Sequence, residues 1–177
     1  MKFEDIDDTV LNKFLKDFVK EKNVEDLSID ELLHAAKRAN QVGGYISLPF
    51  HFTLRAWQLD ATRPDVREAA AFHGKNFIYS SEDRHAELDK LIEKGIGPVA
   101  EWHLMKADKH IESAWNVHGI DYHWLPAFGI ALPHYLEKAA EEISKALSID
   151  PSVQKSEYWN KRFAALFSVQ KYQYLIQ

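Results

Sequence analysis

The sequence predicts an all-α protein of seven or eight helices joined by short corners. Apolar residues recur at intervals of three and four along most of the chain, which is the spacing of one face of a helix. Serine, glycine and proline residues stand where these stretches begin and end. No segment alternates Val, Ile and Thr as a half-buried strand does, and the sequence contains no internal repeat.

Three helices are expected in the first third of the chain. Helical spacing of apolar residues predicts the first over about 4–22. The second covers 28–43, where Ser28 and Glu31 form a capping-box pattern at its start and glycine follows its end. The third covers about 45–59 and is rich in aromatic residues.

Proline and serine residues predict the next two elements. Pro64 suits the first position of a short helix or turn that continues to Phe72. The glycine-containing stretch 73–76 is expected to be a loop. A further helix should follow this loop, with Ser80 or Ser81 as its capping residue.

The second half of the chain should contain three more helices. The segment 95–98 separates the preceding helix from one that contains His110. A long helical stretch is expected over about 122–147, with Pro133 as a kink. The last helix should begin at about Ser152.

The composition excludes several classes of protein and site. The chain has no cysteine, so any metal ligand must come from histidine, carboxylate or tyrosine side chains. The net charge of −5, with both signs interspersed, argues against a nucleic-acid surface. No apolar run approaches the roughly 20 residues of a membrane span, and the acidic N-terminus lacks the layout of a signal peptide. We therefore expect a cytoplasmic protein without a membrane span.

Two histidines, His85 and His110, are each predicted to lie on the apolar face of a helix. An imidazole that faces a core needs a hydrogen-bond partner or a metal for its nitrogen atoms. If the two faces oppose each other, they could hold a flat metal-containing cofactor between them. The residues expected to share these faces are Leu88 and Ile92 with His85, and Leu104, Ala107, Ile111 and Ala114 with His110.

Two passages of the chain carry a family resemblance. A corner at Gly119–Ile120 and a long apolar helix follow Leu104, Ala107 and His110, and this order resembles the proximal region of globins. The passage from Arg63–Pro64–Asp65 through Phe72 and Ser81–Glu82–Asp83 to His85 resembles the globin passage from the proline corner to the distal histidine. The resemblance covers roughly residues 27–175.

The resemblance implies a haem-binding globin-like domain over 27–177, preceded by an N-terminal helical extension over 1–26. His110 would hold the iron and His85 would face it from the other side. Because the chain between the two histidines is short for the family, we expect His85 to ligate the iron directly. The other residues expected against the haem are Phe72, Trp57, Leu88 and Ala107.

Spacing leaves two other histidines as alternatives. The stretch from His110 to Gly119 is long for a globin, so His118 is a second candidate for the proximal ligand. His73 lies in a His–Gly–Lys motif that resembles a distal one, but it ranks below His85. The remaining histidines are expected at the surface or half-buried: His34, His51, His103, His123 and His134. The run from Glu137 to Lys145 is interpreted as a solvated helix face.

The expected function is therefore a haem globin that binds oxygen, NO or CO, with a bis-histidyl haem that serves sensing or electron transfer. Dioxygenase or peroxidase activity would use the same haem. The alternative is a haem-free globin-fold module for signalling or protein interaction. The protein is also expected to form a homodimer.

Overall fold

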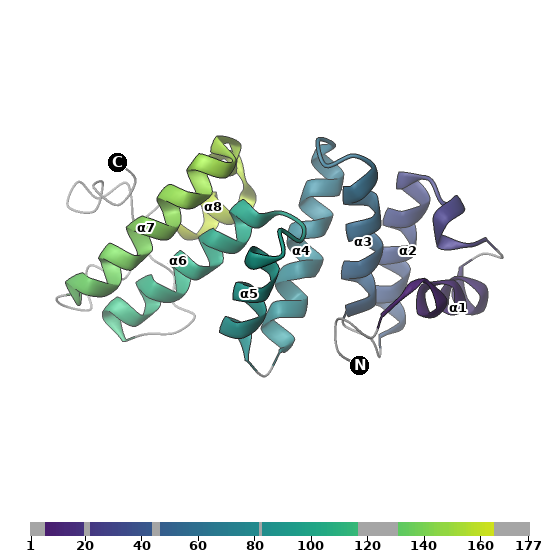
Figure 1. Cartoon of the computed structure of the whole chain (residues 1–177), viewed down its shortest axis with the longest axis horizontal. Helices are drawn as coiled ribbons and strands as arrows, with labels where there is room; N and C mark the ends of the chain where they lie inside the picture. The colour runs from purple at the N-terminus through teal and green to yellow at the C-terminus, as the bar shows by residue number, and fades with distance from the viewer. Residues whose placement is uncertain (1–5, 20–21, 44–46, 82, 117–130, 165–177) are drawn as a thin grey trace. The chain divides into compact units, whose positions relative to one another are not determined.

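The computed structural model describes residues 6–19, 22–43, 47–81, 83–116 and 131–164 (Figure 1). The regular elements of these residues are all helices, and none of these residues forms a strand. The all-α prediction is therefore confirmed, whereas the resemblance to globins stays a prediction. The chain divides into two compact units, Met1–Lys90 with Gly95–Pro98 and Leu91–Lys94 with Val99–Gln177. Each unit is described by itself below.

The first unit contains helices that pack mainly on their neighbours in sequence. The closest packing joins α2 to α3 and α3 to α4. The elements of the first unit are α1 (Asp8–Phe18), the 3-10 turn η2 (Val24–Asp26), α2 (Ile29–Val42), α3 (Ser47–Leu59), α4 (Pro64–Ser80) and most of α5 (Arg84–Glu93).

Helix α1 packs into the same core as α2 and α3. Its buried residues include Phe14 and Leu15, and the ring of Phe14 lies 5.8 Å from that of Phe52 in α3. Arg55 of α3 also forms an ion pair with Asp8 of α1. This helix, predicted as an N-terminal extension over 1–26, is thus built into the core of the first unit. The predicted boundary between 1–26 and 27–177 does not coincide with the division near residues 91–98.

The capping box predicted for α2 is present. The Ser28 hydroxyl accepts a hydrogen bond from the backbone N–H of Glu31, and the Glu31 carboxylate accepts one from the backbone N–H of Ser28. Gly43 ends the helix with a φ of 72°, a conformation that glycine adopts without steric cost.

Helix α4 is longer than predicted. It begins with Pro64 at its first position, as expected, but it continues through the stretch 73–76 that the sequence predicted as a loop. His73 and Gly74 are buried in its interior, on the same face as Phe77, whose ring stacks on Phe50 at 5.8 Å. A glycine costs a helix only about 1 kcal/mol relative to alanine, and burial of this face outweighs that cost.

Helix α5 begins later than predicted. Its start is capped by Asp83, whose carboxylate accepts a hydrogen bond from the backbone N–H of Ala86. Ser80 and Ser81, the predicted capping residues, instead donate their hydroxyl protons to the carbonyl of Phe77 at the end of α4.

The second unit is built around an antiparallel pair of long helices. These are α6 (Val99–Trp115) and α7 (Pro133–Ile149), followed by the 3-10 turn η4 (Pro151–Lys155) and the short helix α8 (Glu157–Arg162). Pro133 occupies the first turn of α7, where a backbone N–H has no partner within the helix and its absence costs nothing. The proline therefore begins this helix and does not kink a longer one. The earlier part of the predicted long helix falls outside the described residues.

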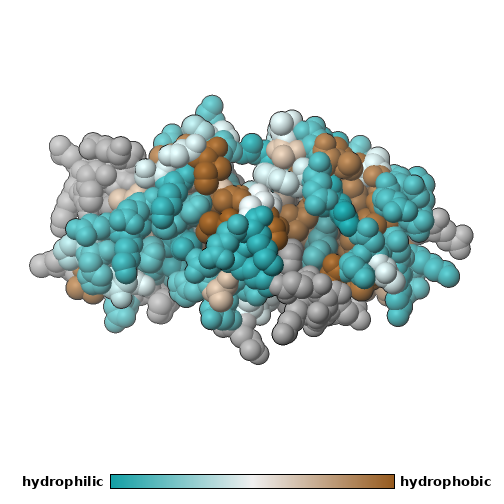
Figure 2. All heavy atoms as spheres, in the orientation of Figure 1, coloured by the Kyte–Doolittle hydropathy of each residue, from teal (hydrophilic) through white to brown (hydrophobic). Residues whose placement is uncertain are grey.

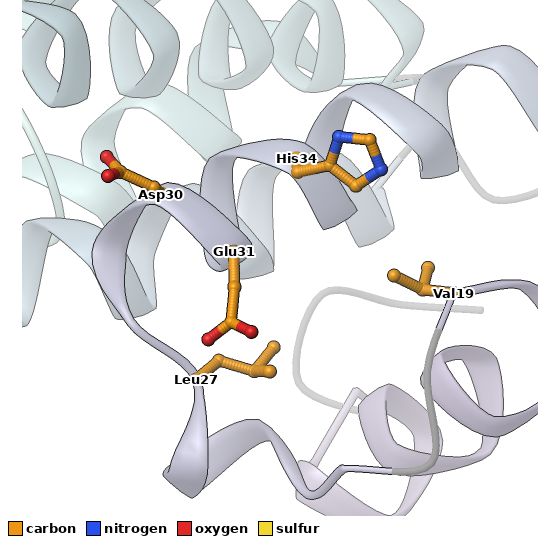
Figure 3. A pocket seen from close by; sticks show the side chains of 5 residues that line it. All are labelled: Val19, Leu27, Asp30, Glu31 and His34. Carbon is orange, nitrogen blue, oxygen red and sulfur yellow. The ribbon is translucent and has the colours of Figure 1, made fainter.

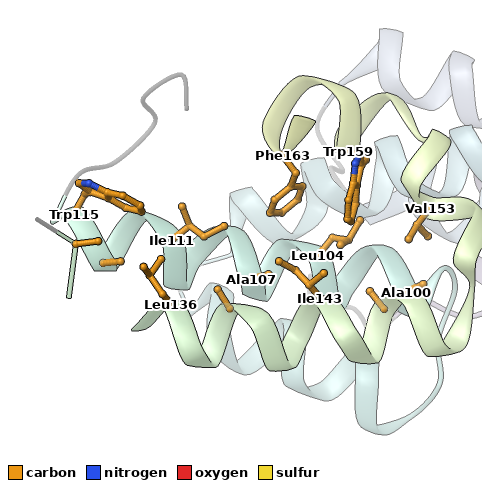
Figure 4. Packing of buried hydrophobic residues seen from close by; sticks show 14 residues of the cluster. Ala100, Leu104, Ala107, Ile111, Trp115, Leu136, Ile143, Val153, Trp159 and Phe163 are labelled. Atoms are coloured by element: carbon orange, nitrogen blue, oxygen red, sulfur yellow. The ribbon is translucent and has the colours of Figure 1, made fainter. Parts of the chain in front are cut away.

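The core of the second unit lies between α6, α7 and α8 (Figure 4). Figure 4 shows Leu104, Ala107 and Ile111 along the side of α6 that faces α7, with Ile143 of α7 beside Leu104 and Leu136 beside Ile111. The predicted apolar stripe on α6 is therefore confirmed. In the described part of the chain, no helix has the length and apolar content to span a membrane.

Candidate functional site

The residues predicted to surround a haem are divided between the two units. The first unit contains Trp57, Phe72, His85 and Leu88, and the second contains Ala107 and His110. Of these residues, Trp57 packs against the first-unit core and Ala107 lies in the second-unit core. The alternative ligand His118 lies outside the described residues, as does His123.

The two predicted iron ligands are not on buried apolar faces. His85 is exposed in the first turn of α5, although Leu88 one turn later is buried. His110 is half-buried beside the stripe of Leu104, Ala107 and Ile111, and α7 already covers that stripe. The positions that flank His110 are thus filled by the protein itself.

Phe72 does not occupy a core position. It lies in the middle of α4 with 53% of its surface exposed, and its contact with a haem stays a prediction. The sequence did not predict this place inside a helix, because the glycine at 74 was interpreted as the end of the helix. Trp57 is half-buried against the first-unit core, and Ala107 is fully buried in the second-unit core.

The first unit also has a small pocket (Figure 3). Its volume is about 170 Å³, and small-molecule sites usually occupy about 300–1,000 Å³. The described residues include no group of three His, Asp or Glu side chains that could hold a metal ion. The pocket is lined by Val19, Leu27, Asp30, Glu31 and His34.

A buried histidine–carboxylate pair joins α6 to α7. The Nδ1 atom of His103 lies 2.6 Å from Oε2 of Glu142, and both side chains are about nine-tenths buried. Lys145 donates to the other carboxylate oxygen at 2.8 Å. Burial raises the pKa of Glu142, but the hydrogen bonds from Lys145 and His103 outweigh this effect and leave it below its usual value. The predictions that His103 is at or near the surface and that Glu142 is solvated are both wrong.

A second buried cluster fastens α8 to α6. The guanidinium of Arg162 donates to Asp108 at 2.9 Å and to Glu112 at 3.2 Å. The side chains of Asp108 and Glu112 are only 5% and 9% exposed, and that of Arg162 is 20% exposed. Arg162 on α8 therefore pairs with carboxylates on two turns of α6, and Lys109 lies 3.8 Å from Glu112 as a second cation.

His73 is a third buried titratable group. It is 8% exposed on α4, where its ring meets that of Phe72 edge-on at 5.0 Å. Burial lowers the pKa of His73, so its neutral form is favoured in the folded protein.

The outer face of α4 presents large aromatic side chains to solvent, which is unusual for a solvated helix. Hydrophilic side chains cover most of the surface in view in Figure 2, and hydrophobic ones show in smaller patches. On α4, however, Phe72 and Tyr79 are exposed by 53% and 36% and stand two turns apart on one face. Large apolar side chains on the same outer face of one helix mark an interaction site more often than scattered ones do.

Two cationic groups lie over the Tyr79 ring. The amine of Lys75 lies 5.7 Å and the guanidinium of Arg84 lies 5.2 Å from the centre of the Tyr79 ring. Both distances fall within the range of a cation–π contact. We define the α4 surface as Glu68, Phe72, Lys75, Asn76, Tyr79 and Arg84.

Comparisons of this chain with protein families, with curated proteins and with solved structures found no match.

Proposed function

We propose that this protein is an all-α protein-interaction module and that the α4 surface is its binding site. The observation that carries the proposal is the 53% exposure of Phe72 in the middle of a regular 17-residue helix. Aromatic residues and arginine are enriched in the cores of protein interfaces, because they bury a large area on few rotatable bonds. Tyr79 and Arg84 extend this pattern beyond Phe72.

A photo-crosslinking amino acid at Asn76 tests this proposal. Asn76 is exposed between Phe72 and Tyr79, so a reactive group there should form covalent adducts with a bound protein in the cells that produce the chain. The matched control is the same group at Gln41, an exposed position on α2. We expect adducts from position 76 that are lost when Phe72→Ser is added, and none from position 41.

The masses of the adducts identify the partner. An adduct of twice the chain mass contains a second copy, and any other mass contains a different protein. If position 76 gives no adduct beyond the control, the α4 surface does not bind protein and the proposed function fails.

Haem binding through His110 stays a prediction that visible absorbance can decide. When purified protein is titrated with haemin, we expect no sharp Soret band, because His85 and Phe72 are exposed and α7 covers the apolar stripe beside His110. His134→Ala, at an exposed histidine, is the control variant. A sharp band that persists in this control and disappears in His110→Ala would contradict our proposal and assign the iron to His110. Loss in His118→Ala instead would assign it to His118.

A further inference from the structure

We infer that the partner of the α4 surface is a second copy of this chain, bound through the same surface in antiparallel orientation. This inference rests on the proposed function and names its partner. A two-fold symmetric interface places one surface against itself, so that surface must be complementary to its own rotated copy. The order of charges along α4 meets this condition.

The charges change sign on either side of Phe72. Glu68 precedes Phe72 by one turn, and Lys75 follows it by one turn on the same face. We consider two copies of α4 that run antiparallel with Phe72 at the symmetry axis. Each residue that follows Phe72 in one copy then faces a residue that precedes Phe72 by a similar interval in the other copy. Glu68 of each copy then meets Lys75 of the other, while the two Phe72 rings meet at the centre.

The neighbouring groups extend the same pattern. Tyr79 and the guanidinium of Arg84 lie beyond Lys75, where they would meet Asp65 of the other copy. Asp65 is exposed and shares Arg63 with Asp30 in its own chain, so it contributes less than Glu68 does. Glu68 forms no ion pair with any residue in the described segments, and its carboxylate faces solvent. A parallel arrangement would instead place Glu68 against Glu68 and Lys75 against Lys75, which is repulsive.

The size of the α4 surface sets the strength of this association. A helix of 17 residues is about 25 Å long. One face of it buries less than the roughly 800 Å² per partner of a standard stable interface. The dimer should therefore be in reversible exchange with the monomer, with a Kd in the micromolar range or weaker, on the order of 10⁻⁶ to 10⁻⁴ M.

Charge exchange at Glu68 and Lys75 provides the decisive experiment. Sedimentation equilibrium over a range of concentrations measures the Kd of wild type, Glu68→Lys, Lys75→Glu and the double variant. We expect each single variant to dimerise at least about tenfold more weakly, because each replaces two attractive contacts by two repulsive ones. The double variant should return to nearly the wild-type Kd, since it exchanges the charges at both positions and restores the two attractive contacts.

Mixing the two single variants adds an independent test. Glu68→Lys carries two cations at these positions and Lys75→Glu carries two anions, so an equimolar mixture should form heterodimers more tightly than either forms homodimers. Lys37→Glu makes the same change of charge at an exposed position on α2 and should leave the Kd unchanged. Circular dichroism of each variant verifies that it is folded.

The outcomes separate this inference from the proposed function. The inference is overturned if the wild-type protein is monomeric at every concentration. It is also overturned if the dimer has the same Kd in wild type, Glu68→Lys, Lys75→Glu and the double variant. If position 76 then still crosslinks to a protein of another mass, the interaction module stands and only its partner is reassigned. If it crosslinks to nothing, both fail.

Discussion

Replacement of Arg162 by methionine will lower the free energy of unfolding by about 3–5 kcal/mol. The reason is that Asp108 and Glu112, each more than nine-tenths buried, lose the guanidinium that pairs with both of them, while Lys109 stays 3.8 Å from Glu112. Methionine keeps much of the side-chain volume, so the loss reports the uncompensated charges rather than a cavity. Urea unfolding followed by circular dichroism measures this change.

Arg63 offers a matched control for Arg162. It also contacts two carboxylates, those of Asp30 and Asp65, but both of these acids are more than half exposed. Water and salt screen such contacts, so Arg63→Met should change stability far less than Arg162→Met does. Adding Asp108→Asn and Glu112→Gln to Arg162→Met should recover much of the loss. Equal effects at Arg63 and Arg162 would show that burial of the α6–α8 cluster does not determine its strength.

Leu15→Ala will destabilise the protein by about 2–5 kcal/mol, although this residue lies in the helix that the sequence predicted as an extension. Leu15 is 0% exposed and belongs to the same hydrophobic cluster as Phe52 of α3. Its truncation removes apolar contacts and leaves a cavity in the first-unit core. Urea unfolding again gives the magnitude.

The control for Leu15 is Phe18→Ala in the same helix. Phe18 is 47% exposed, so its truncation removes a larger side chain but less buried area. We expect a clearly smaller loss than for Leu15→Ala. A neutral Leu15→Ala would mean that α1 contributes nothing to the core, as a detached extension would.

The helices were predictable because their signals are local. The Ser28–Glu31 capping box, the glycine after α2 and Pro64 at the start of α4 each involve residues within one turn of the helix end, and the structure confirms all three. Gly74 was misleading for the same reason. Its preference for loops is local, whereas the burial of His73, Gly74 and Phe77 that keeps α4 continuous depends on other helices.

The polar clusters could not be predicted, because their members are far apart in the sequence. His103 and Glu142 are separated by 39 positions, and Asp108 and Arg162 by 54. Nothing near Glu142 distinguishes it from the exposed Glu141 beside it until α6 packs against α7. The α4 surface was within reach, since Phe72 and Tyr79 share a face in any continuous helix. Because the sequence predicted a loop at 73–76, Phe72 and Tyr79 were not predicted to share a helix face.

The neighbour-to-neighbour packing described for α2, α3 and α4, and for α6 and α7, has a consequence for how the protein acquires its structure. A chain whose main tertiary contacts join consecutive helices loses little entropy in closing the loops between them, so such topologies fold in microseconds to milliseconds. During synthesis, α2 and α3 can pair as soon as both have left the ribosome, well before Arg162 is made. The α4 surface can then be complete on a nascent chain, where neighbouring ribosomes on one messenger bring copies of it together.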